Sequence, residues 1–149
     1  MRFVAIAAAA VLLAPCSHAF GATEKIPDAQ ALLLLETKAD QASPKEQCFL
    51  YAEVVHDMTE IAGQELSSGD FAHASQTLKA MQAYAQKIHM GVAEDTHKLK
   101  NAEILLRHTA FRLNEILHNA SVDDQPTLQS TLKQLNQVQT EVMLQVFKH

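Results

Sequence analysis

The residues best suited to chemistry in this chain are histidines that follow an acidic residue by three positions. The spacing Glu-x-x-His occurs at Glu53/His56, Glu94/His97 and Glu115/His118, with Asp70/His73 as a variant. Residues three apart in a helix share one face, so each pair could offer a carboxylate and an imidazole to the same transition-metal ion. The chemistry therefore depends on the helices that carry these pairs and on which way the pairs face.

Di-iron bundles of the ferritin-like type use this spacing on two helices and a lone Glu on each of the others, all pointing inward. Placing the apolar residues of each helix at heptad position a puts every Glu of the three pairs at c and every His at f. The position a residues are Tyr51, Met58, Phe71, Leu78, Leu99 and Leu113. Positions c and f face solvent, so we expect the pairs on outer faces, supporting their helices and binding no metal.

Other catalytic or cofactor chemistry finds little support. His73 and His108 also fall at outward positions, and the four glycines are too scattered for a phosphate-binding loop. Haem held without a covalent bond by Met58 or Met81 and a histidine is the alternative that the residues leave open. We therefore predict no enzyme, no catalytic residue, no cofactor and no metal ligand.

The composition favours helices. Hydrophobic residues make up 48% of the 149, while Gly and Pro number only four each. We expect a short helix over Asp28–Gln41 and a capping box at Ser43–Glu46 that starts the next one. Gly69 should end that helix and Asp70 should cap another. The helix that ends at Gly69 carries an apolar stripe of Cys48, Tyr51, Val54, Val55, Met58, Ile61 and Ala62.

The stretch from Phe71 to Asn119 has two interpretations, because its heptad phase is continuous. In the first, Gly91 is a left-handed cap that ends one helix, and Asp95 or Thr96 caps the next; in the second, one long helix runs through. Asn119 and Ser121 mark a stop, and Asp124-Gln125-Pro126 marks the start of a last helix.

The fold class that follows is all-α. We predict an up-down antiparallel bundle of about four helices preceded by a short N-terminal helix; the alternative is one long helix 71–119 flanked by two shorter helices. The turn Gly69-Asp70-Phe71, followed by Ala74 and Leu78, resembles half of a tetratricopeptide repeat. The absence of a second copy at the expected period restricts that resemblance to one helical hairpin.

Apolar residues remain that the bundle does not need. Four leucines in a row, Leu32, Leu33, Leu34 and Leu35, cannot share one helical face, because successive residues turn by about 100°. Leu144 and Phe147 fall at outward positions of the last helix. Either the short helix covers the last one, which we favour for the fold, or these residues form a partner surface.

The N-terminus has the features of a secretory signal. Arg2 precedes an apolar run over 3–14, and small residues suggest cleavage near Ala19 or Ala22. We predict a signal at 1–22, a leader with a short Leu-rich helix at 23–42 and a bundle at 43–149. The protein is then exported, to the periplasm or outside the cell, unless Cys16 carries a lipid anchor.

The remaining cysteine and the charge limit the function. After cleavage only Cys48 would remain, either as a small buried hydrophobe or paired with another chain. The formal net charge of −5 argues against nucleic acid, and no membrane span is expected once the signal is removed. We expect an exported, non-enzymatic binding protein (an adaptor, a chaperone-like protein or a subunit) that binds another protein or itself. A four-helix metal or haem carrier is the alternative.

Overall fold

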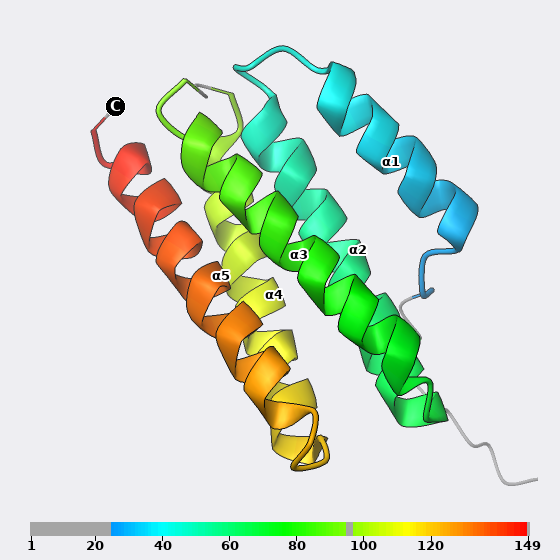
Figure 1. Cartoon of the computed structure of the whole chain (residues 1–149). Coiled ribbons are helices and arrows are strands. Elements are labelled where there is room, and N and C mark those ends of the chain that lie inside the picture. The colour runs from blue at the N-terminus through cyan, green and yellow to red at the C-terminus, as the bar shows by residue number, and fades with distance from the viewer. Residues whose placement is uncertain (1–24, 95–96, 149) are drawn as a thin grey trace, which may run out of the picture.

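The computed structural model describes residues 25–94 and 97–148, and these form helices with no strand (Figure 1). The helices are α1 (Ala29–Gln41), α2 (Gln47–Ser68), α3 (Phe71–Gly91), α4 (Leu99–Asn119) and α5 (Gln125–Val146). The prediction of an all-α bundle of four long helices after one short helix is confirmed. No helix in these two ranges is both long and apolar enough to cross a membrane.

The four long helices form two hairpins that lie side by side. α2 pairs with α3 and α4 with α5, while α2 also contacts α4 and α3 also contacts α5. Chain direction alternates along the sequence, so the two hairpins meet through parallel pairs, α2–α4 and α3–α5 (Figure 1). In the predicted up-down bundle each helix would neighbour the next one in the sequence. α3 and α4 differ from this, because they lie diagonally across the bundle.

The core is built from the predicted stripes. Leu78, Met81, Leu106, Leu113 and Leu135 are fully enclosed, together with most other residues of the heptad positions. Three threonines also lie in the core, and each hydroxyl donates to the backbone carbonyl four residues earlier: Thr59, Thr109 and Thr131. No buried polar side-chain atom among the described residues lacks a hydrogen bond, as a uniquely packed interior requires.

The turn between α2 and α3 follows the sequence prediction. Gly69 adopts a left-handed φ of 81°, and its N–H donates to the Leu66 carbonyl. The carboxylate of Asp70 then accepts from the backbone N–H of His73, which caps α3. Gly is the residue that adopts this backbone conformation at little cost, so the break at Gly69 is encoded locally.

The start of α2 differs from the predicted capping box. Ser43–Glu46 forms a separate turn, in which the Ser43 hydroxyl donates to the Glu46 carboxylate at 3.0 Å. Neither side chain caps α2, whose first residue is Gln47. The two residues of the box therefore bond to each other, and the helix begins one turn later than predicted.

The break between α3 and α4 is present, but Gly91 does not cause it in the predicted way. Gly91 is the last residue of α3 and keeps a right-handed helical φ. Among the described residues other than glycine, only Lys98 has a positive φ, 58°, and it immediately precedes α4. Asp95 and Thr96, the predicted caps, lie outside the described residues, as do the signal segment 1–22 and Cys16.

Candidate functional site

The sequence suggested that α1 covers α5, but α1 lies against α2, on the opposite side of the bundle from α5 (Figure 1). Leu32 and Leu35 pack against the core, and Ala39 is fully buried. Gln47 adds a hydrogen bond from its side-chain amide to the Ala39 carbonyl at 3.3 Å. The prediction was wrong because an apolar stripe shows that a face is buried but not which helix buries it.

A polar clasp ties the end of α1 to α2 and α3. The Asp40 carboxylate accepts from the Tyr51 hydroxyl at 3.1 Å and from the Lys87 ammonium at 2.7 Å. Lys87 also lies over the Tyr84 ring, 4.5 Å from its centroid, and the two tyrosine rings are 5.7 Å apart. The hydrogen bond from Lys87 lowers the pKa of Asp40, and burial raises the pKa of Tyr51 to about 12.

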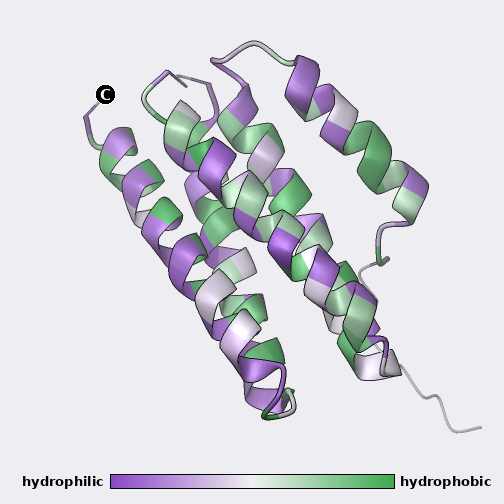
Figure 2. Ribbon diagram, in the orientation of Figure 1, coloured by the Kyte–Doolittle hydropathy of each residue, from purple (hydrophilic) through white to green (hydrophobic). Residues whose placement is uncertain are grey.

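The two leucines between the packed positions of α1 point away from the bundle. Leu33 is 61% exposed and Leu34 is 65% exposed, and this part of α1 is strongly hydrophobic in Figure 2. At the other side of the bundle, Leu144 and Phe147 are exposed by 54% and 81%, as the heptad register of α5 predicts. The two apolar sets therefore do not cover each other.

A trough follows the seam between α2 and α4. Its upper hollow, of about 550 Å³, is bordered by α1, α2 and the start of α4, including Leu34, Lys38, Phe49, Leu50, His97 and Lys98. A middle hollow of about 430 Å³ includes Phe49, Glu53, His56, Asn101, Ile104 and His108. A lower hollow of about 440 Å³ includes Ile26, His56, Glu60, His108, Phe111 and Arg112. Shared residues join the three hollows, so we call them together the α2–α4 trough.

The charged groups of the upper trough influence one another. Lys98 Nζ lies 5.0 Å from the centroid of the Phe49 ring. Burial raises the pKa of the neighbouring Glu53, an effect that the charges of Lys38 and Lys98 oppose and that of Asp57 reinforces. The half-buried carboxylate of Glu53 is therefore within electrostatic range of the Lys38 and Lys98 ammonium groups, next to the apolar ring of Phe49.

Glu53 and His56 are placed differently from the prediction of outer-face residues. Both are half-buried in the trough, where Nδ1 of His56 lies 3.1 Å from the Thr109 hydroxyl of α4. That hydroxyl also donates to the Leu105 carbonyl, so His56 is joined through Thr109 to the backbone of α4. The prediction failed because α2 contacts α1, α3 and α4, so its covered surface is wider than one heptad stripe.

Glu115 and His118 are solvent-exposed on α4, as predicted. Glu94 and His97 are exposed too, but the prediction that they lie on a helix was wrong, because α3 ends at Gly91 and α4 begins at Leu99. The described part of the chain holds no cluster of three or more His, Cys, Asp or Glu side chains that could bind a metal ion. Met58 and Met81, considered as haem ligands, are buried in the core, whereas His56 is half-buried in the trough and the other described histidines are exposed. The expectation that no metal is bound stays a prediction.

Cys48 lies in the core cluster beside the start of α2. It is 2% exposed, which agrees with the interpretation of this residue as a small buried hydrophobe.

Sequence reasoning missed the trough and the clasp. The trough joins residues as distant as Ile26 and Arg112, so no local pattern could reveal it. The clasp left one signal: Tyr51 lies in an apolar stripe, and a buried tyrosine hydroxyl normally has a hydrogen-bond partner.

No protein-family model, curated protein or solved structure matches this chain.

Proposed function

We propose that this protein is exported and acts without catalysis, by binding another protein through the exposed leucines of α1. The observation that supports this is the difference in burial along Leu32–Leu35. Leu32 and Leu35 pack α1 against the bundle, while Leu33 and Leu34 are mostly exposed to solvent. Burying one leucine side chain is worth roughly 1.5 to 3 kcal/mol, so a partner that covers both gains substantially.

The position of α1 also suits a docking element. α1 lies at one side of the bundle, where it packs mainly against α2 and reaches α3 through the side chains of Asp40 and Lys87 (Figure 1). Adjacent exposed apolar side chains on such an element typically mark an interaction site. An adaptor, a chaperone-like protein or a subunit of an assembly would all use a surface of this kind, in the periplasm or outside the cell.

The experiment is affinity capture from the native host with two paired variants. In the first pair, Leu33→Glu and Leu34→Glu remove the α1 surface; in the control, Leu144→Glu and Phe147→Glu remove the other apolar set. We expect the first pair to lose a specific partner and the control to keep it, with the melting temperature of both close to that of the parent, because all four side chains are exposed.

Two results would overturn the proposal. One is loss of the partner with the control variant but not with the α1 variant. The other is a change in molar mass by light scattering of the α1 variant alone, which would show that a second copy of this chain, rather than another protein, covers Leu33 and Leu34.

A further inference from the structure

The upper hollow of the α2–α4 trough combines an apolar floor with cationic walls. Phe49 and Leu50 of α2 form the floor, and the lining also includes Leu34 and Lys38 of α1 and Lys98, whose Nζ lies 5.0 Å from the centroid of the Phe49 ring. Its volume of about 550 Å³ lies within the range of roughly 300 to 1,000 Å³ that is usual for small-molecule sites.

The two lysines are available to an anionic ligand. Within the described residues, neither ammonium group lies within 4 Å of a carboxylate. The residues that line the hollow include two lysines, Lys38 and Lys98, and one acidic residue, Glu46, so the lining carries one net positive charge in a chain whose formal net charge is −5. The carboxylate of Glu53 lies in the adjoining middle hollow, where the charges of both lysines oppose the rise in its pKa.

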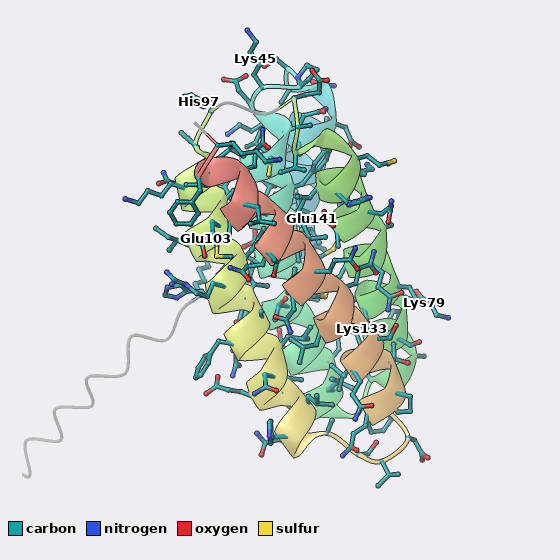
Figure 3. The ribbon with its side chains drawn as sticks, turned by 90° about the vertical axis from the view of Figure 1, so that its left-hand side faces the viewer. Lys45, Lys79, His97, Glu103, Lys133 and Glu141 are labelled. Carbon is teal, nitrogen blue, oxygen red and sulfur yellow. The ribbon has the colours of Figure 1, made fainter. Side chains whose placement is uncertain are left out.

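The backbone that carries Lys98 is held in an unusual conformation. Its φ of 58° is unfavourable for a residue with a Cβ atom, and such strain persists only where the surroundings enforce it. The neighbouring His97 N–H donates to the Lys45 carbonyl at 3.1 Å, which joins the start of α4 to the turn before α2. His97 and Lys45 lie together at one end of the bundle in Figure 3. The side chain of Lys98 is thereby placed over Phe49.

We propose that the upper hollow binds a small amphiphile with an anionic head group and an aliphatic tail, such as a long-chain carboxylate. The head group lies between Lys38 and Lys98, where charge-assisted hydrogen bonds are strong, and the tail covers Leu34, Phe49 and Leu50. A small inorganic anion would leave the apolar floor in water, and a cationic amphiphile would meet the two ammonium groups. This site shares Leu34 with the proposed partner surface, but its other residues are different, and ligand binding to the isolated protein does not depend on the proposed protein partner.

The test is calorimetric titration of the mature protein with dodecanoate, below the concentration at which the probe forms micelles. The variant Lys38→Gln/Lys98→Gln removes both charges and keeps the side chains long. Its control is Lys79→Gln/Lys133→Gln, which removes two exposed lysines that lie toward the other end of the bundle (Figure 3). We expect one dodecanoate per chain, about tenfold or greater weakening in the first variant, and less than about twofold change in the control.

Two further probes separate the contributions of head group and tail. Acetate carries the head group alone and dodecyltrimethylammonium carries the tail with the opposite charge; we expect neither to bind nor to displace dodecanoate. The proposal is overturned if dodecanoate does not bind, if the cationic probe binds equally well, or if the first variant and the control weaken alike. Circular dichroism melting curves of both variants, expected to match that of the parent, exclude unfolding as the cause of a loss.

Discussion

The two parallel helix pairs of this bundle, α3–α5 and α2–α4, share a geometry but differ in how their outer seams are closed. Along α3–α5, polar side chains cross the seam at Gln82–Thr131 (2.8 Å) and His89–Glu141 (2.6 Å), and Gln134 donates to the Gln82 carbonyl. Along α2–α4, the side chain of Ile116 lies against Gly63, and hollows border the seam on both sides of this contact.

The difference follows from side-chain size and charge. Because residue 63 is glycine, the side chain of Ile116 can lie directly against α2, whereas toward the N-terminal ends Phe49, Glu53 and His56 line a hollow. The seam between α2 and α4 thus has a close contact at Gly63 and hollows before and after it.

The substitution with the largest expected effect is Gly63→Val, which adds side-chain atoms where Ile116 of α4 lies against α2. A Cβ at position 63 would lie 3.0 Å from Cδ1 of Ile116, and the two methyl groups of valine reach further. Overpacking of this kind typically costs about 1 to 3 kcal/mol. We expect a lower free energy of unfolding in urea denaturation.

Gly91→Ala is the matched control for that substitution. A Cβ at position 91 meets nothing within 4 Å, and Gly91 keeps a helical backbone. Because alanine forms helix better than glycine, we expect stabilisation of up to about 1 kcal/mol. Destabilisation by both variants would mean that close approach is not what distinguishes Gly63.

Gln82→Ala tests the closed seam of α3–α5. The Gln82 side chain donates to the hydroxyl oxygen of Thr131, which is buried, so its removal should cost about 1 kcal/mol. Gln86→Ala on the same helix, at an exposed position, is the control and should have almost no effect. Equal melting temperatures for both variants would contradict the role assigned to this hydrogen bond.

How far the sequence predicts the structure differs between these regions. The helix spans, the Gly69 turn and the core residues follow from local spacing, because capping and helical periodicity act over only a few residues. The trough could not be predicted, since its residues come from α1, α2 and α4. The stripe of α2 indicates one buried face, whereas α2 has three neighbours, and this is why Glu53 and His56 were assigned to solvent.

The smallest effect is expected for Glu53→Gln, which tests the open seam of α2–α4. Burial raises the pKa of Glu53, so the folded state binds its proton more tightly than the unfolded chain does. The ionised carboxylate therefore disfavours folding above the unfolded-state pKa, and the penalty disappears below about pH 4. We expect the variant to gain a few tenths of a kcal/mol at pH 7, after allowance for solvent screening, and nothing at pH 4.

Thermal unfolding of the parent and of Glu53→Gln at both pH values measures this difference. Glu94→Gln, at an exposed position, is the control and should show no pH-dependent gain. A loss of stability in Glu53→Gln at pH 7 would mean that the charge of this carboxylate stabilises the trough.

We infer that another protein binds at the α1 side of the molecule. The most direct test is photo-cross-linking in the native host, with a photoreactive amino acid placed at position 33 in one variant and at position 147 in another. Both positions are exposed; position 33 is in α1 and position 147 follows α5, and these two helices lie on opposite sides of the bundle (Figure 1). We predict an adduct with another protein from position 33 and none from position 147; adducts from position 147 alone, or from neither position, would contradict this.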